Sequence, residues 1–344
     1  MVDELLLSTA EKVFGDTCTF EAIEAAEANG WAPEIWRAVA QTGLPWISVP
    51  ESAGGSGGSL ADALAVVQVA ARYGAPIPIA ETGLLAGWLL ASAGLPIGEG
   101  VATVVPGNEL TFAGGRLNGV AHQVAWASAA ERIVVLIDGQ VASVATSAVS
   151  VERRPNLAGE PRDTVTFDNV TPEAVAPTTI TRDQFMRRGA LTRIALTAGA
   201  IGRMSELTIQ YTTDRKQFGQ AVRRFQLVQA HLVHLAQDAQ LVSMALQAAV
   251  AAVEAGAGDF EIAAAKAIAA NASLSSARLA HQAHGAMGMT REYPLHHLTR
   301  RVWAWRPEYG DEGYWNRIVM STAVDTGADR LYGLIANGSR PNNW

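Results

Sequence analysis

Residues 211–229, YTTDRKQFGQAVRRFQLVQ, contain the side chains best suited to binding a ligand. Arg215 carries a planar, permanently charged guanidinium that can donate to two oxygens of an anion, and such charged donors bind oxygens more strongly than neutral ones. Phe218 can cover an apolar part of a ligand, and Gly219 lets the backbone approach it closely. The order of these residues therefore indicates an anion-binding joint.

A structural role for the same residues is the alternative. Arg215 would then pair with Asp214 or Asp238 on the surface, and Phe218 would pack in the core. Three pairs of arginines could also hold a phosphate, although a solvated helix face is the commoner role of such pairs, at 187–188, 223–224 and 300–301.

The composition is that of an ordinary globular protein and excludes several classes of function. The 344 residues are 49% hydrophobic and 17% charged, and the net charge of −7 gives no basic excess for nucleic acid. Cys18 is the single cysteine, which excludes an internal disulfide and any multi-cysteine metal or iron–sulfur site. We therefore expect no metal and a reducing, cytoplasmic location. Glu81 and Pro96 interrupt the apolar window 79–98, which favours a buried helix over a membrane span.

Three regions with different periodicity follow one another along the chain. Residues 1–100 show helical spacing of apolar residues, which predicts helices over 3–14, 20–29, 32–42 and 60–73. Residues 101–180 show short alternating runs and predict five or six strands, with a hairpin turn at Asp138-Gly139. Residues 181–344 return to helical spacing and predict a bundle over 185–213, 222–255, 259–285, 293–304 and 311–336. The fold class expected is mainly α with a small central β domain.

The glycine-rich segment 49–59, VPESAGGSGGS, precedes the fourth of these helices. It has neither the Gly-Lys-Ser/Thr ending of a phosphate-binding loop nor Rossmann spacing after a clear strand. We interpret it as a plain connection, in which Ser59 caps a helix that ends before Gly74.

This order of elements, with three stretches inside it, resembles the acyl-CoA dehydrogenase family, flavoproteins that oxidise the Cα–Cβ bond of an acyl-CoA thioester. The stretches are LPWISVPESAGGSGGS, YTTDRKQFGQAVRRFQLVQAHLVHLAQD and AHQAHGAMGMTREYPLHHLTRR. The resemblance implies FAD as cofactor and an acyl-CoA substrate. It also implies an N-terminal helical domain, a short β-barrel or sheet domain, and an up-and-down helical bundle that contacts FAD and forms oligomers.

In that family the joint at Arg215 reaches across a dimer interface to the pyrophosphate and adenine of the neighbouring subunit's FAD. The residues that match the FAD-contacting motifs are Arg215, Gln217, Phe218, Gln226, Gln282, Gly285 and Ala286. Ala286 departs from the pattern, because a second glycine is often found there. Arg193 matches the substrate-facing arginine, although it could instead hold a carboxylate at an interface.

The part of the family pattern that faces the subunit's own flavin is poorly matched. A Thr-Glu-Pro-x-Ala-Gly-Ser-Asp loop is expected there, and residues 101–115 keep only Pro106-Gly107. Trp126 is only a loose match to the tryptophan that lies near the flavin in the family. The resemblance therefore implies an eroded flavin loop.

The catalytic base is also in doubt. Removal of the substrate's α-proton needs a carboxylate within hydrogen-bond reach of Cα. The two family positions for the base are held by Thr192 and, when counted without a gap, by Tyr309. A shift of three residues would place Glu312 there instead. The alternative for Glu312 is a first-turn glutamate stabilised by the helix dipole.

Three interpretations remain. The first is a subunit that completes the FAD site of a second acyl-CoA dehydrogenase-like chain in an α2β2 complex, of the type that acts on steroid side-chain thioesters, without supplying the base. The second is a self-sufficient homotetrameric dehydrogenase that uses Glu312 as base. The third is a structural helical protein that has lost FAD, which the match at 215–219 and Gln282 argues against.

Overall fold

The computed structural model describes residues 3–339 and divides into two compact units. Unit 1 contains the described residues up to Val67 and Ala75–Arg188, and unit 2 contains Gln68–Gly74 and the described residues from Gly189 onward. Helices predominate, and the strands form a small region between them in the sequence, which confirms the expected fold class. The division into three domains stays a prediction, since the N-terminal helices and the strands lie in one unit.

The four N-terminal helices lie within three residues of the predicted ranges. Their bounds are α1 Glu4–Thr17, α2 Phe20–Asn29, α3 Pro33–Ala40 and α4 Leu60–Arg72. Ser59 Oγ accepts a hydrogen bond from the Asp62 amide at 3.1 Å, and the Asp62 carboxylate accepts one from the Ser59 amide at 3.0 Å. Burial acts to raise the pKa of Asp62, but the hydrogen bonds from Ser59 hold that pKa below its ordinary value. This reciprocal pair is a capping box and confirms Ser59 as the N-cap.

The apolar window 79–98 contains a buried helix, as expected, but the first part of this helix is wound in the wide π form. The π-helix spans Ala80–Gly87 and continues into α5, Trp88–Ser92. Gly83 is required by close packing, because a Cβ on it would lie 1.6 Å from the carbonyl oxygen of Pro45. Thr82 then donates to the Ala102 carbonyl at 3.0 Å, which ties the helix to the first strand.

Two four-stranded sheets make up the β region of unit 1. One has the order β1-β4-β5-β8, with bounds Ala102–Pro106, Arg132–Ile137, Gln140–Ala145 and Ala174–Pro177. The other has the order β2-β3-β7-β6, with bounds Leu110–Ala113, Arg116–Ala125, Arg162–Val170 and Ser150–Glu152. β1 and β4 run parallel, and the other neighbours are antiparallel.

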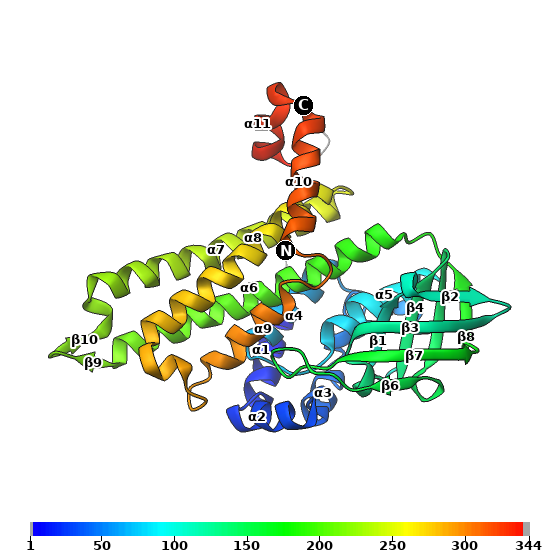
Figure 1. The fold of residues 1–344 in the computed structure, drawn as a ribbon, viewed down its shortest axis with the longest axis horizontal. Helices are drawn as coiled ribbons and strands as arrows, with labels where there is room; N and C mark the ends of the chain where they lie inside the picture. The colour runs from blue at the N-terminus through cyan, green and yellow to red at the C-terminus, as the bar shows by residue number, and fades with distance from the viewer. Residues whose placement is uncertain (1–2, 340–344) are drawn as a thin grey trace. The chain divides into compact units, whose positions relative to one another are not determined.

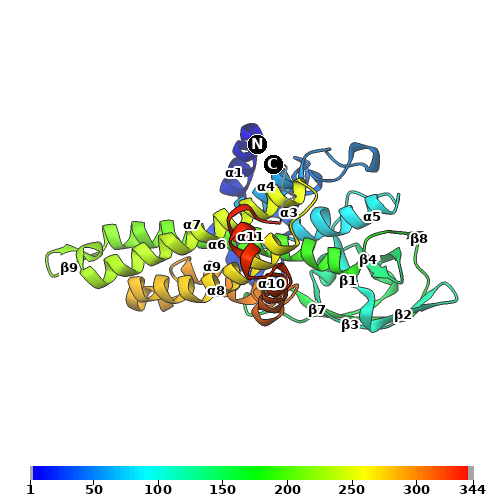
Figure 2. The same ribbon diagram turned by 90° about the horizontal axis from the view of Figure 1, so that it is seen from above.

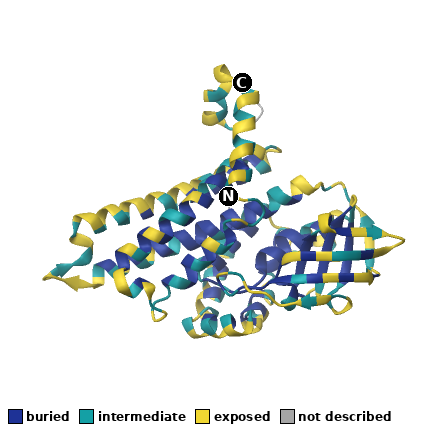
Figure 3. Cartoon of the chain, in the orientation of Figure 1, coloured by how far each residue is buried: buried dark blue, intermediate teal, exposed yellow. Residues whose placement is uncertain are grey.

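The expectation of five or six strands was wrong, since the two sheets contain eight. β6 and β8 have three and four residues, which is too short for an alternating pattern to be recognised. The hairpin at Asp138-Gly139 is confirmed, because both residues have positive φ, 48° and 71°, as a type I′ turn requires. Residues from both sheets form one hydrophobic core, seen as dark blue strands in Figure 3, including Leu117, Ile133, Val135, Val165 and Phe167.

Unit 2 is built on long helices that lie side by side (Figures 1 and 2). Their bounds are α6 Arg182–Asp214, α7 Gln226–Glu254, α8 Asp259–His284, α9 Leu295–Trp305, α10 Glu312–Thr326 and α11 Ala328–Asn337. α8 packs along α7 and also contacts α9 and α10, and its many alanines allow this close approach.

Two of the helix predictions needed correction. The helix expected from 311 to 336 is broken at Gly327, whose φ of 80° a continuous helix cannot contain. The helix expected from residue 222 begins at Gln226, because Val222–Arg224 form a 3₁₀ turn. None of the helices described between residues 3 and 339 combines the length and the apolarity needed to cross a membrane.

Candidate functional site

The joint between α6 and α7 is a two-stranded ribbon. β9, Lys216–Gln217, pairs with β10, Gln220–Ala221, and Phe218-Gly219 form the turn between them. The φ angles of the two turn residues are 49° and 79°, so this is a type I′ turn. The Val222 amide donates to the Arg215 carbonyl at 2.8 Å and closes the base of the ribbon. Figure 1 shows the ribbon at the end of α6 and α7.

The structure does not support the alternative in which Arg215 has a surface ion pair. Asp214 accepts a hydrogen bond from the Gln210 amide at 2.6 Å, and Asp238 accepts one from Ser276 at 3.0 Å. Arg215 is exposed, and no carboxylate within the described residues pairs with its guanidinium. The neighbouring cations are exposed as well, namely Lys216, Arg223 and Arg224. With Arg215, Lys216, Arg223 and Arg224 against Asp214, the joint therefore presents an excess of positive charge.

Phe218 is not a core residue, since 90% of its surface is exposed. Its only aromatic neighbour in the described chain is Phe225, in an edge contact with 6.2 Å between the ring centroids. A φ of 49° on a residue with a Cβ costs about 1 kcal/mol. An exposed aromatic ring on a strained backbone is suited to a contact outside this chain. Gly219 supplies the second positive φ, and a Cβ there would touch nothing within 4 Å.

The second matched motif lies at the end of α8. Gln282, Gly285 and Ala286 are all exposed. Gly285 ends α8 with φ 62° and ψ −139°, a conformation that is open essentially only to glycine. The turn therefore presents bare backbone to the outside, which suits close approach by a ligand. Gln217 and Gln226 are exposed on the ribbon and at the start of α7.

Three aromatic rings in mutual contact connect the two motifs. Tyr211, one turn before Arg215, stacks on His284 with 4.5 Å between the centroids, and Tyr293 contacts both rings at 5.5 and 4.9 Å. His284 is buried and donates from Nδ1 to the Ala280 carbonyl at 2.8 Å. Burial lowers the pKa of His284, so the ring is neutral at pH 7. The structure thus brings the Arg215 and Gly285 motifs together.

Sequence reasoning missed this cluster of rings. Tyr211 and Tyr293 both lie within the matched stretches, so their types could have indicated a packing role. Their pairing could not be inferred, because 82 positions separate them in the sequence. The Tyr293 hydroxyl donates to the Leu207 carbonyl at 3.3 Å and fixes the third ring against α6.

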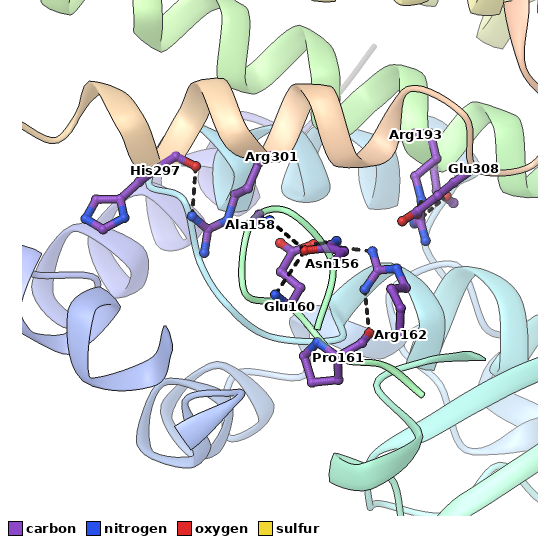
Figure 4. A network of polar contacts seen from close by, with 10 residues as sticks. Asn156, Ala158, Glu160, Pro161, Arg162, Arg193, His297, Arg301 and Glu308 are labelled. Atoms are coloured by element: carbon purple, nitrogen blue, oxygen red, sulfur yellow. Dashed lines mark hydrogen bonds and ion pairs between the residues drawn. The ribbon is translucent and has the colours of Figure 1, made fainter. Parts of the chain in front are cut away.

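The region of the candidate base is filled by the chain's own side chains. Arg193 is 2% exposed and donates to the Glu308 carboxylate at 2.6 Å and to Thr192 Oγ1 at 3.2 Å (Figure 4). Its guanidinium also lies 4.9 Å from the centroid of the Tyr309 ring. That ring covers Gly189 of α6, where an added Cβ would lie 2.1 Å from it. Arg193 is therefore engaged within the chain.

Glu312 occupies the first turn of α10, beside the N-cap Asp311, which accepts from the Tyr314 amide at 2.8 Å. Its carboxylate accepts from Arg306 at 2.7 Å, and both side chains are about one-third exposed, at 29% and 31%. Lys266 lies behind the same loop and donates from Nζ to the Arg306 carbonyl at 2.7 Å. These contacts are those of a loop fixed in place.

In unit 1, β1 ends at Pro106 and β2 begins at Leu110, and a single 3₁₀ turn, Gly107–Glu109, connects them. Trp126 is 3% exposed, and the Arg162 guanidinium lies 5.9 Å from its ring centroid. Arg162 is paired with Glu160 at 3.3 Å, and Glu160 accepts from the Asn156 amide at 3.2 Å (Figure 4). A buried polar network thus covers one face of the tryptophan.

Comparisons with known proteins agree with these motifs. Family profiles match residues 3–96 (acyl-CoA dehydrogenase, N-terminal domain) and residues 182–322 (acyl-CoA dehydrogenase, C-terminal domain). The acyl-CoA dehydrogenase FadE28 of Mycobacterium tuberculosis is 29% identical over 76% of this chain and 84% of its own length. The acyl-CoA dehydrogenase IpdE2 of the same organism is 29% identical over 82% of this chain and 84% of its own length.

Solved structures share the fold. A chain of the ChsE4–ChsE5 complex from Mycobacterium tuberculosis superposes with a TM-score of 0.87 at 22% identity, over 95% of this chain and 99% of that chain. The Tcur3481–Tcur3483 steroid ACAD G363A variant gives 0.83 at 23% identity, over 98% of both chains. FAD is the cofactor of the family, as in the solved complex of PigA with FAD and proline. Together the two matched domains and the shared fold show that this chain belongs to the acyl-CoA dehydrogenase family, whose members are FAD-dependent oxidoreductases that act on acyl-CoA thioesters.

Proposed function

We propose that this chain is a subunit of a cytoplasmic acyl-CoA dehydrogenase complex, in which it completes the FAD site of a partner subunit and does not supply the catalytic base. The partner would be a second acyl-CoA dehydrogenase-like chain, and an α2β2 assembly is the arrangement we expect. The exposed joint carries this proposal, because Arg215 has no carboxylate partner in the described chain and Phe218 is 90% exposed.

The chain's residues fit the phosphate end of FAD. Arg215 would bind the pyrophosphate as a charged fork, with Gln217, Gln226 and Gln282 as further exposed donors. The bare turn at Gly285-Ala286 would let the backbone come close to the same group. Bound FAD supplies the acceptor for the hydride that leaves the substrate Cβ. The contacts among Tyr211, His284 and Tyr293 would hold the Arg215 joint and the Gly285 turn at a fixed separation.

Residues of this chain are poorly suited to the chemical step. Thr192 has no carboxylate, and its hydroxyl donates to the Gly189 carbonyl at 2.7 Å. Tyr309 is occupied by its contacts with Gly189 and Arg193. The Arg306 pair of Glu312 at the start of α10 favours a structural role for that glutamate. We therefore assign the removal of the substrate's α-proton to a carboxylate of the partner. In this proposal Arg193 does not bind substrate but pairs with Glu308.

The substrate class that we propose is a bulky acyl-CoA, such as a steroid side-chain thioester. The likeness to a chain of the ChsE4–ChsE5 complex and to a steroid ACAD supports both the partner and this substrate class. The alternative is a self-sufficient homotetramer in which Glu312 removes the α-proton. The observation in its favour is that Glu312 is accessible, with 29% of its side chain exposed.

The proposal is tested by producing the chain alone and together with its acyl-CoA dehydrogenase-like partner, and by measuring bound flavin from its visible absorbance. We expect flavin in the complex and little in this chain alone. In the complex, Arg215→Ala should weaken FAD binding by roughly tenfold to a hundredfold, the loss of one charged hydrogen bond. The matched control is Arg317→Ala, because Arg317 is an exposed arginine on α10.

Turnover separates the two assignments of the base. Glu312→Gln in the complex should leave the rate of acyl-CoA oxidation within about twofold of the unmodified complex, because Glu312 then acts only in the pair with Arg306. A loss of a hundredfold or more would assign the base to Glu312 and favour the homotetramer. Substrate-dependent bleaching of flavin by this chain alone would refute the partner role.

A further inference from the structure

Arg188, in the first turns of α6, is a partly buried cation with no part in the flavin role of the joint. Its Nε donates to the Leu84 carbonyl of the π-helix at 3.1 Å, and its Cζ lies 4.9 Å from the centroid of the Trp88 ring. All three residues belong to unit 1. Burial lowers the pKa of Arg188 to about 10, so the guanidinium keeps its charge at pH 7.

No acidic side chain among residues 3–339 pairs with this guanidinium. Its contacts are the Leu84 carbonyl and the Trp88 ring, and neither carries a negative charge. Burial alone shifts the pKa of Arg188, whereas a nearby carboxylate would act to raise it. Taking a charge out of water without a counter-charge costs free energy. An anion from outside the chain would offset that cost.

The end of the guanidinium is suited to a carboxylate. Because Nε is bonded to the Leu84 carbonyl, Nη1 and Nη2 are the nitrogens that a ligand can use. These two nitrogens donate in parallel, and the two oxygens of a carboxylate match their spacing. The Trp88 ring fixes the plane in which such a pair would form.

The π-helix that carries Leu84 is held firmly in unit 1. A Cβ on Gly83 would lie 1.6 Å from the Pro45 carbonyl oxygen, and one on Gly87 would lie 2.8 Å from Cγ2 of Val49. These close contacts prevent the helix from shifting toward residues 45–49. Leu84 and Trp88 therefore hold the guanidinium in one place, and a ligand need not order it on binding. Wide π turns are frequent at functional sites.

Charge and position favour a carboxylate over a phosphate. Consecutive residues of an α-helix point about 100° apart, so Arg187 and Arg188 do not face one phosphate together. A single guanidinium balances the single charge of a carboxylate. The Trp88 ring beside it is only partly buried and offers a flat apolar surface to the rest of the ligand.

We propose that Arg188 binds the carboxylate of a small ligand whose body is flat and apolar. Nη1 and Nη2 donate two parallel hydrogen bonds to the carboxylate, and the body of the ligand packs against Trp88. This anion site lies in unit 1, whereas Arg215 lies in unit 2, so it does not depend on the flavin role of the joint.

Benzoate is the probe for this site, and saturation-transfer NMR on the full chain gives its Kd by titration. We expect a Kd of about 1 mM or lower, the strength of two charged hydrogen bonds with a ring contact. Benzamide has the same shape without the charge, and inorganic phosphate has charge without the flat body. Both should bind at least about tenfold more weakly. Equal binding of benzoate and benzamide, or tighter binding of phosphate, would overturn the assignment.

Substitutions of Arg188 locate the binding. Arg188→Met keeps the apolar stem and should weaken benzoate at least about tenfold, and about 10 mM benzoate should raise the melting temperature of the unmodified chain but not of this variant. Arg188→Lys keeps the charge without the fork and should weaken benzoate about threefold to tenfold. The matched control is Arg182→Met, because Arg182 is exposed in the first turn of the same helix, and its Kd should stay within about twofold. Unchanged binding in either Arg188 variant would refute the site.

The co-produced complex distinguishes a free ligand from an acidic side chain of the partner. A free ligand requires that the complex still binds benzoate and that Arg188→Met weakens this binding. If formation of the complex abolished the part of benzoate binding that depends on Arg188, the partner would occupy the site and the proposal would fail.

The flavin role has a separate readout in the same samples. Arg215→Ala should leave the Kd of benzoate unchanged while flavin content falls. A complex that binds FAD through Arg215 but shows no benzoate binding would refute the Arg188 site alone. Benzoate binding that depends on Arg188, together with full flavin content in Arg215→Ala, would refute only the role proposed for Arg215.

Discussion

Lys266 should make the free energy of unfolding rise with pH. Its side chain is 2% exposed, and its Nζ donates to the Arg306 carbonyl at 2.7 Å. Burial lowers the pKa of Lys266 from 10.5 to about 8, and the Glu308 carboxylate opposes that shift. The loop that carries Glu308 and Tyr309 therefore rests on a lysine that loses its proton more easily in the folded chain than in the unfolded one.

The sign and size of the effect follow from proton linkage. Between pH 8 and 10.5 the unfolded chain binds more protons at Lys266 than the folded chain, so the free energy of unfolding rises with pH across this window. The lysine's contribution is fully present above 10.5 and is lost as the pH falls to about 8. From pH 7 to pH 9, a pKa of about 8 against 10.5 gives a gain of about 1.3 kcal/mol.

Urea denaturation at pH 7 and pH 9, of the unmodified chain and of Lys266→Met, isolates this contribution. Other groups titrate in the same range, but they titrate in both proteins, so the difference between the two pH dependences belongs to Lys266. We expect the unmodified chain to gain about 1.3 kcal/mol more than the variant. Equal pH dependences would refute the reasoning, and a larger gain in Lys266→Met would show that its sign is wrong.

Three further outcomes are expected. Glu308→Gln removes the carboxylate charge that the buried Arg193 contacts at 2.6 Å and should lower the free energy of unfolding by about 3 kcal/mol. Glu312→Gln in the more exposed pair should cost less than about 1 kcal/mol, and equal losses in urea denaturation would contradict this. Phe218→Asn relieves the left-handed backbone and should raise the free energy of unfolding by up to about 1 kcal/mol. Flavin retention in the complex should fall in the same variant, and unchanged retention would rule out the proposed ligand contact. Gly285→Ala forces φ 62° and ψ −139° on a residue with a Cβ and should cost about 1–3 kcal/mol, seen as a lower melting temperature; no change would show that the turn adapts.

Local features of the sequence were sufficient for many boundaries. Ser59 and the period of the following segment located the start of α4, because a cap and a helical repeat act within a few residues. Asp138-Gly139 located the hairpin for the same reason. The short strands Ser150–Glu152 and Ala174–Pro177 escaped prediction, since their partners, and not their own pattern, make them strands.

Some properties of the candidate site could be predicted from local sequence, and others could not. The motif residues at Arg215, Phe218 and Gly285 could be named from the sequence, because residue type and spacing within one segment indicate their chemistry. The exposure of these residues could not be inferred, and the sequence left open the alternative in which Phe218 is in the core and Arg215 is paired. Exposure depends on how far the rest of the bundle covers a segment, which the segment itself does not encode.

By itself the sequence determined the family, the order of helical and strand regions, and the residues able to hold an anion at the joint. The tertiary structure alone decided that Arg193 is paired with Glu308, that three rings connect the Arg215 and Gly285 motifs, and that the Arg188 guanidinium lies over Trp88. Arg193 and Glu308 are 115 positions apart. Such pairs form only when the chain has folded, because the free energy of a buried contact depends on the surroundings that distant segments supply.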